Sequence, residues 1–168
     1  GRGGMSPGQQ RFHRHPARYR RLQSGNQVGK SYAGAAEAWW AMTGTHPFQP
    51  APPALLGWIV LPDLQGDWPK VSSKLHALQP PGILAPRCHY DGVRGYMSGG
   101  QRCIELVNGA VCYPKSGTQD ALALEGATID WCWVDEPPKR THWLTLSQRT
   151  AVKDGKIWLT FTPIGRPV

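Results

Sequence analysis

The residues with the clearest chemical potential form a short glycine-containing segment, Ser24-Gly25-Asn26-Gln27-Val28-Gly29-Lys30-Ser31. Its second half matches the phosphate-loop pattern G-x-x-x-x-G-K-[ST], while Ser24 stands where the pattern has its first glycine. Backbone N–H groups of such a loop surround a phosphate at a helix N-terminus, where the helix dipole favours an anion. We expect residues 25–31 to bind nucleotide phosphates, with Lys30 on the terminal phosphates and Ser31 on Mg²⁺. The alternative is a glycine-rich turn that only caps a helix.

An apolar run that ends in two acids forms the second motif, Ile129-Asp130-Trp131-Cys132-Trp133-Val134-Asp135-Glu136. A parallel strand places its last residues at the carboxyl edge of the sheet, where ligands bind. We expect Asp135 to hold Mg²⁺, directly or through water, and Glu136 to orient and deprotonate an attacking water. A surface acidic pair is the alternative, and Asp130 requires a partner if it is buried.

A third motif ends the next predicted strand, Trp158-Leu159-Thr160-Phe161-Thr162-Pro163. The hydroxyl groups of Thr160 and Thr162 would lie close to the γ-phosphate and would respond to its presence. The alternative is a threonine-rich strand end that precedes a proline turn.

Patterns of residue type place these motifs at the ends of secondary-structure elements. The alanine-rich stretch 30–43 predicts a helix, which Thr43-Gly44 and Pro47 terminate. Runs rich in β-branched and aromatic residues predict strands at 55–61, 128–134 and 157–161, and a second helix is predicted at 68–78. Residues 46–53 are predicted as a loop, and 82–101 carry no clear pattern. This alternation indicates an α/β fold.

A hairpin is predicted within this α/β fold. Asn108-Gly109 separates the apolar segments 103–107 and 111–113, and this dipeptide accepts the positive φ angles of a type I′ turn. Cys103 and Cys112 would then approach each other across the hairpin.

Composition excludes several classes of protein. The 168 residues include 20 Gly and 16 Pro, a content that excludes a helical bundle or a coiled coil. Collagen is also excluded, because glycine does not recur at every third residue. The sequence contains no run of 18 apolar residues, so it predicts no membrane-spanning helix. The four Cys form no CxxC pair, so we expect reduced, packed thiols rather than a zinc site.

Positive charge is concentrated at the N-terminus. The formal net charge is +8, and the first 30 residues hold seven basic and no acidic residues. Aromatic residues interleave with the bases of 11–21, which predicts contacts with a polyanion or, alternatively, a merely solvated basic arm. We expect 1–18 to be a basic, flexible arm, with 1–4 a cloning remnant, and 19–168 to be the folded domain.

Taken together, these motifs resemble the ATPase domain of the large terminase subunit of tailed bacteriophages. The resemblance rests on 24–31, on the acidic strand with Pro137-Pro138 after it, and on Thr160-Phe161-Thr162-Pro163. It implies a RecA-like P-loop NTPase of the ASCE type, in which helices flank a mainly parallel twisted sheet with an inserted β-hairpin. It also implies adenine contacts from the lead-in, at Gln9 or Gln10 with Phe12.

The resemblance further implies an activity and its partners. The activity is hydrolysis of ATP with Mg²⁺, which drives double-stranded viral DNA into a procapsid in the cytoplasm of an infected bacterial host. The implied partners are DNA, the portal ring, the small terminase subunit and further copies of the chain in a ring. No contact with a membrane is implied. No arginine lies between 115 and 134, so Arg102, Arg140 and Arg166 are the candidates for the cation offered to a neighbouring subunit, and we favour Arg140.

Two departures from the family limit what is carried over. Only one acid, Asp154, follows Glu136, so the two-metal nuclease domain of larger terminases is not expected here. The lid segment that usually follows the third motif in this family is not expected either. Three other functions remain open: a non-catalytic nucleotide-binding assembly module, another P-loop DNA translocase or helicase, and a small-molecule kinase. A catalytic glutamate directly after the metal-binding aspartate favours hydrolysis over the kinase.

Overall fold

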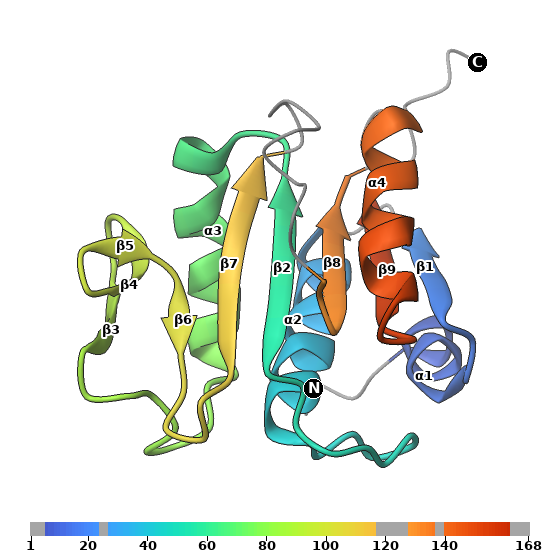
Figure 1. Cartoon of the computed structure of the whole chain (residues 1–168), viewed down its shortest axis with the longest axis horizontal. Coiled ribbons are helices and arrows are strands. Elements are labelled where there is room, and N and C mark those ends of the chain that lie inside the picture. The colour runs from blue at the N-terminus through green and yellow to red at the C-terminus, as the bar shows by residue number, and fades with distance from the viewer. Residues whose placement is uncertain (1–5, 24–26, 117–127, 137–139, 162–168) are drawn as a thin grey trace.

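The computed structural model describes residues 6–23, 27–116, 128–136 and 140–161. Within these ranges the chain is an α/β fold with a six-stranded main sheet in the order β1-β9-β8-β2-β7-β6 (Figure 1). The helices are α1 (Pro7–Arg14), α2 (Gln27–Thr43), α3 (Leu64–Ala77) and α4 (Arg140–Ala151). The strands of the main sheet are β1 (Tyr19–Gln23), β2 (Leu56–Leu61), β6 (Ile104–Glu105), β7 (Val111–Ser116), β8 (Trp131–Asp135) and β9 (Lys156–Phe161).

The main sheet is parallel except at one edge. Its parallel pairs are β1 with β9, β9 with β8, β8 with β2 and β2 with β7, whereas β6 pairs antiparallel with β7. Parallel strands covered on both faces are apolar along their length, and the first four residues of β8 are all buried. The sheet therefore brings the last residues of β1, β8 and β9 to one edge, where the predicted chemistry lies.

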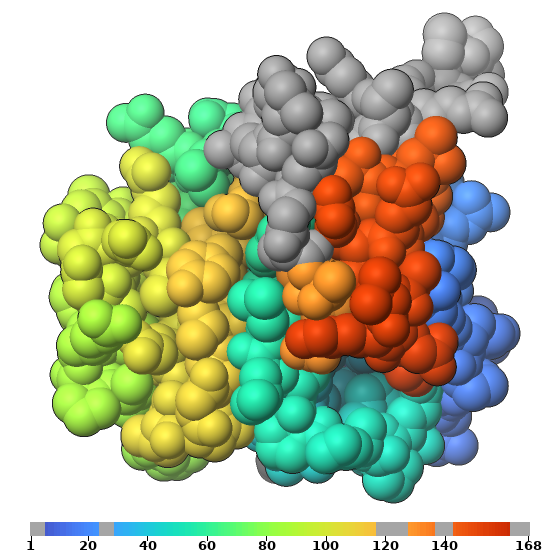
Figure 2. All heavy atoms as spheres, viewed as in Figure 1, coloured from blue at the N-terminus to red at the C-terminus, as the bar shows by residue number. Residues whose placement is uncertain are grey.

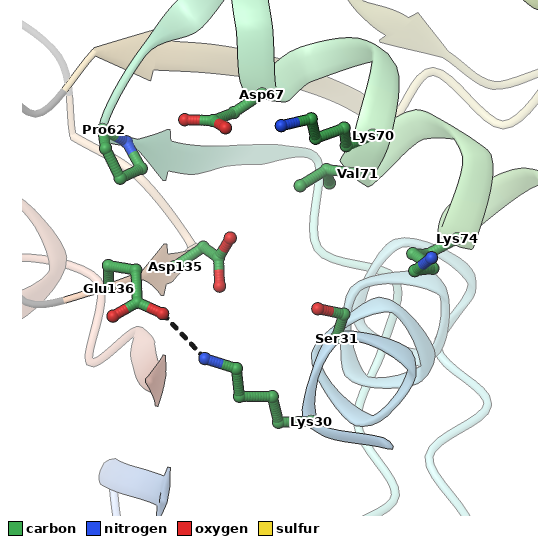
Figure 3. Close-up of a pocket in the computed structure, with 9 residues that line it drawn as sticks. All are labelled: Lys30, Ser31, Pro62, Asp67, Lys70, Val71, Lys74, Asp135 and Glu136. Atoms are coloured by element: carbon green, nitrogen blue, oxygen red, sulfur yellow. Dashed lines mark hydrogen bonds and ion pairs between the residues drawn. The ribbon is translucent and has the colours of Figure 1, made fainter. Parts of the chain in front are cut away.

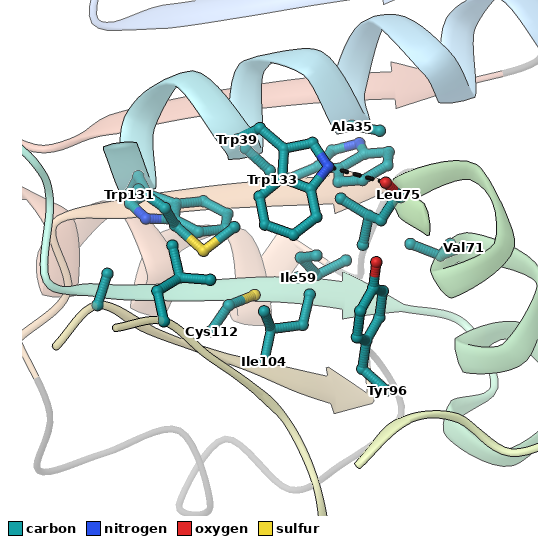
Figure 4. Close-up of a cluster of buried hydrophobic side chains, with 14 of the residues drawn as sticks. Ala35, Trp39, Ile59, Val71, Leu75, Tyr96, Ile104, Cys112, Trp131 and Trp133 are labelled. Atoms are coloured by element: carbon teal, nitrogen blue, oxygen red, sulfur yellow. Dashed lines mark hydrogen bonds between the residues drawn. The ribbon is translucent and has the colours of Figure 1, made fainter. Parts of the chain in front are cut away.

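Helices cover the two faces of the sheet unequally. On one face α1, α2 and α3 pack over a large apolar cluster that includes Trp39, Leu75 and Trp133 (Figure 4). On the other face α4 packs with Leu146 over a smaller cluster around Cys132 and Ile157. Figure 2 views this second face, where α4 lies over the β8–β9 side and spheres of β2 and then β7 are visible to its left.

Tryptophan packing fixes the spacing between α2 and the sheet. Trp131 and Trp158 stack with ring centroids 5.3 Å apart. A Cβ atom at Gly34 would lie 2.2 Å from the Trp133 indole, and one at Gly57 would lie 1.8 Å from the Trp131 indole. Both positions thus require glycine, because any side chain would occupy the space of an indole ring.

A buried ionic network joins the N-terminal segment to this core. The Glu37 carboxylate accepts a hydrogen bond from Arg20 at 2.5 Å and lies 2.6 Å from His13 Nδ1 and 2.9 Å from His46 Nε2. Burial raises the pKa of Glu37, but the hydrogen bonds from both histidines and Arg20 outweigh it and hold this pKa well below its usual range. Because the partners come from α1, β1 and the segment after α2, the network fixes three parts of the chain.

The N-terminal segment departs from the expected arm. A capping box of Ser6 and Gln9, with Pro7 in the first turn, starts α1, and Phe12 and His13 on this helix are buried. Arg18 donates hydrogen bonds to the Gly155 and Ser147 carbonyl oxygens. The expectation of a flexible arm over 1–18 is therefore wrong for 6–18, because buried side chains hold this segment against the domain.

The hairpin around Asn108-Gly109 is confirmed, but the type I′ turn is not, because Gly109 has a φ of 93° whereas Asn108 does not have a positive φ. It is not a separate insertion, since its second strand, β7, pairs with β2 within the parallel sheet. Cys112 faces Ile104 in the register rather than Cys103. Residues 82–101, for which the sequence predicts no element, hold most of a small antiparallel sheet of β3 (Cys88–Asp91), β4 (Gly95–Ser98) and β5 (Gln101–Arg102).

All four cysteines are buried free thiols, as expected. Burial raises the pKa of each thiol, that of Cys103 to about 11. Within the described residues, no helix combines the length and hydropathy that crossing a membrane requires.

Candidate functional site

An ion pair joins the two main motifs at the carboxyl edge of the sheet. Lys30, near the start of α2, donates from Nζ to Glu136 Oε1 at 2.7 Å (Figure 3). The Lys30 side chain is 2% exposed, whereas that of Glu136 is 34% exposed. A lysine this deeply buried needs an anion beside it, and here that anion stands at the rim of a cavity.

The backbone turns sharply at Glu136. Its φ angle is 73°, a left-handed conformation that costs a residue with a Cβ atom about 1 kcal/mol. The N–H of Glu136 donates to the Thr160 carbonyl oxygen at 2.9 Å, which holds the turn. This turn ends β8 and places the carboxylate within reach of Lys30.

Asp135 is held by the adjoining strand β9. The Thr160 hydroxyl donates to Asp135 Oδ1 at 3.2 Å and accepts from Trp133 Nε1 at 2.8 Å. Burial raises the pKa of Asp135 to about 6; the charge of Lys30 and the Thr160 hydroxyl oppose this, while Glu136 and Asp67 add to it. A nearby cation would favour the ionised form of this carboxyl group.

A cavity of about 300 Å³ opens between these groups and α3. Its polar lining includes Lys30, Ser31, Asp135 and Glu136 on one side, and three residues of α3 on the other (Figure 3). The α3 residues are Asp67, Lys70 and Lys74.

The donor set fits Mg²⁺. Ser31 supplies a hydroxyl and Asp135 a carboxylate to the same cavity, and Mg²⁺ commonly takes one or two protein ligands, with waters and phosphate oxygens in its other positions. Among the residues that the structure describes, no group of three or more His, Cys, Asp and Glu could hold a metal ion by itself. The site therefore suits a metal that arrives with a phosphate rather than a closed protein cage.

Several predicted site residues lie outside the described part of the chain. Gly25, Asn26 and Thr162 fall outside the described residues, and the structure gives only the backbone of Gln27, Val28 and Arg140. Their predicted roles stay predictions.

The lead-in residues lie beside the loop. Gln9 on α1 donates from Nε2 to the Gly29 carbonyl oxygen at 2.8 Å and accepts from the Ser6 N–H at 3.0 Å. Phe12 is buried with the Arg20 guanidinium 5.0 Å from its ring centroid, and it also lines an open hollow of about 430 Å³ beside β1. The adenine contacts expected from Gln10 and Phe12 stay a prediction.

Sequence patterns alone did not single out the three α3 residues of the cavity. Their positions, 67, 70 and 74, recur at helical spacing and so share one face of α3. That spacing was the available signal, but a polar stripe on a helix ordinarily faces solvent.

The chain matches one known protein family. A family model described as "Terminase large subunit, T4likevirus-type, N-terminal" matches residues 22–163, which include both halves of the site. Searches of curated proteins and of solved structures gave no match.

Proposed function

We propose that this chain hydrolyses ATP to drive double-stranded DNA into a procapsid. The premise is that the chain belongs to the terminase large subunit family of T4-like type and so has a role in phage DNA packaging. One observation carries the proposal: the 2.7 Å pair between Lys30 and Glu136, which brings the loop motif and the acidic motif together beside a cavity. A phosphate-binding lysine and a candidate base in one cavity suit phosphoryl transfer to water.

The pair suggests how binding prepares the chemistry. A nucleotide phosphate competes with Glu136 for the Lys30 ammonium, because charge-assisted bonds to phosphate are strong. The released Glu136 carboxylate then orients a water and accepts its proton. Mg²⁺, when bound, neutralises charge that develops on the transferred phosphoryl group.

Thr160 acts in this proposal as a positioning residue. Its hydroxyl holds Asp135, its carbonyl oxygen holds the backbone of Glu136, and both acids therefore depend on β9. A change at the end of β9 would move both acids together, which suits the predicted coupling of hydrolysis to movement.

The strand order supports the RecA-like P-loop fold proposed for the chain. β9 lies between β1, which leads into the loop, and β8, which ends in the acids. In the proposal, this separation makes room for a terminal phosphate and a water between the loop and the acids. We extend the proposal to assembly as a ring on a portal with the small terminase subunit, in which Arg140, at the start of α4, serves a neighbouring site.

Measured phosphate release tests the proposal. Glu136→Gln keeps the size of the side chain and removes the base, so hydrolysis should fall by about 10²- to 10⁴-fold while binding of ATP with Mg²⁺ is retained. The matched control is Glu105→Gln, a glutamate that pairs with Arg87 and lies outside this cavity. We expect the control to hydrolyse ATP at the wild-type rate.

Two results would contradict the proposal in different ways. Equal rates for Glu136→Gln and the wild type would place the base elsewhere. Binding of ATP without phosphate release, with or without DNA, would instead support the non-catalytic assembly module.

A further inference from the structure

We propose that Lys70 and Lys74 of α3 bind the terminal phosphate of the nucleotide, so that this chain supplies its own second set of cations opposite Lys30. The proposal rests on the proposed function and concerns how the same site distinguishes a triphosphate from a diphosphate. It is carried by the position of the two lysines on the wall of the cavity (Figure 3).

The helix that carries the lysines is firmly held. Trp68 is fully buried and donates from Nε1 to the Tyr96 carbonyl oxygen at 3.0 Å, and Leu75 accepts from the Trp39 indole at 2.9 Å through its carbonyl oxygen. Val71, also buried, lines the cavity between the two lysines. This packing holds the face of α3 that carries Lys70, which is exposed, and Lys74, which is half-buried, along the wall of the cavity.

Lys74 is tied to the loop side of the cavity. Its ammonium lies 5.5 Å from the centroid of the Tyr32 ring, and Tyr32 directly follows Ser31 on α2. The cation–π contact therefore holds this charge near the hydroxyl that would face the metal and phosphates. The two sides of the cavity, α2 and α3, meet at this contact.

Three lysines line the cavity, together with the acids Asp67, Asp135 and Glu136. Lys30 pairs with Glu136, whereas no ion pair within the described residues involves Lys70 or Lys74. Lysine suits a phosphate as a flexible point charge. A triphosphate carries one more phosphate group than a diphosphate, and in this proposal its last phosphate extends from the loop toward α3.

Calorimetry with two ligands tests this proposal without measuring activity. The probes are the non-hydrolysable analogue adenylyl imidodiphosphate and ADP, each with Mg²⁺. In the double variant Lys70→Ala, Lys74→Ala we expect affinity for the analogue to fall about tenfold or more, as the loss of charge-assisted bonds implies. Affinity for ADP should change by less than about threefold.

Two further variants separate charge from other effects. Lys70→Arg, Lys74→Arg keeps both charges and should restore most of the affinity for the analogue. Lys153→Ala removes one positive charge at a residue outside this cavity, where Lys153 lies 3.6 Å from Asp130, and should leave both affinities unchanged. Urea unfolding of each variant checks that the fold is retained.

The outcomes distinguish failure of this inference from failure of the proposed function. If the double variant keeps the wild-type preference for the analogue while Lys30→Ala loses binding, only this inference is overturned. An equal loss of affinity for the analogue and for ADP in the double variant overturns it too, because the lysines would then not distinguish the terminal phosphate. Weaker binding to duplex DNA with unchanged nucleotide preference would assign them to DNA instead, and a wild type that binds neither nucleotide would overturn both proposals.

Discussion

Two glutamates of this chain pair with buried cations, but their surroundings differ. Glu37 is enclosed, with a side chain 2% exposed and with Arg20, His13 and His46 all on its carboxylate. Glu136 stands at the edge of a cavity, one-third exposed, with Lys30 as its ion-pair partner.

The difference separates a structural ion pair from an exchangeable one. The partners of Glu37 come from three parts of the chain, so breaking that network would loosen the packing of α1 and β1 on α2. The pair of Lys30 and Glu136 has a cavity beside it, through which, in the proposed function, a phosphate replaces one partner. Under that proposal, similar charges serve stability at one place and ligand exchange at the other.

The largest expected effect lies in the enclosed network. Glu37→Gln leaves Arg20 buried without a counter-charge, and loss of one partner of a buried pair costs about 3–5 kcal/mol of unfolding free energy. Urea unfolding should detect this loss, whereas Glu136→Gln, measured in the same way, should lose less, because this carboxylate borders a cavity and the charge of Asp135 stays near Lys30. Equal losses would remove the distinction between the two pairs.

The pair of Lys30 and Glu136 should matter more for the binding of ATP than for the stability of the fold. Lys30→Ala removes a charge-assisted bond to phosphate that typically contributes about 1.5–3 kcal/mol, so affinity for ATP should fall about tenfold or more. Calorimetry on the folded variant measures this. Unchanged affinity would mean that residues 25–31 do not form a phosphate loop.

A smaller effect is expected at the residue that positions both acids. Thr160→Val leaves the buried Trp133 N–H without its acceptor, at a cost of about 1–3 kcal/mol of unfolding free energy. Thr160→Ser keeps the hydroxyl and should retain the hydrogen bonds, with a loss below about 1 kcal/mol. If valine and serine were equivalent in thermal or urea unfolding, the hydroxyl would have no structural role.

The smallest effect concerns pH. The pKa of Glu37 is lower in the folded chain than in the unfolded chain, so its stabilisation is complete above about pH 4.5 and is lost as the pH falls toward the folded value. The difference in unfolding free energy between the wild type and Glu37→Gln should shrink below pH 4.5, by at most about 1.4 kcal/mol per pH unit. A difference that grows on acidification would contradict the ionic network.

The central part of the fold was predictable because its signals are local. The alanine-rich run predicts α2, the apolar runs predict β2, β8 and β9, and Asn108-Gly109 predicts the turn before β7. The same locality explains why Lys30, Ser31, Asp135 and Glu136 were identified, since each ends or begins a predicted element.

The remaining features depend on contacts between distant residues. The strands β3, β4 and β5 are two to four residues long and form through pairing and burial rather than propensity. The partners of Glu37 are scattered over positions 13, 20 and 46, so no motif marks them. The one available signal was Glu37 itself, a lone acid in an alanine-rich helix, which must be paired if that helix is buried.

The buried thiols make this chain convenient for site-specific labelling. A thiol reacts with maleimide reagents as the thiolate, and all four native thiols are both buried and raised in pKa. Val152, 73% exposed in the turn after α4, can be replaced by cysteine at little structural cost. A fluorophore at that position would be attached without prior removal of the native cysteines, which opens single-molecule spectroscopy of the intact chain.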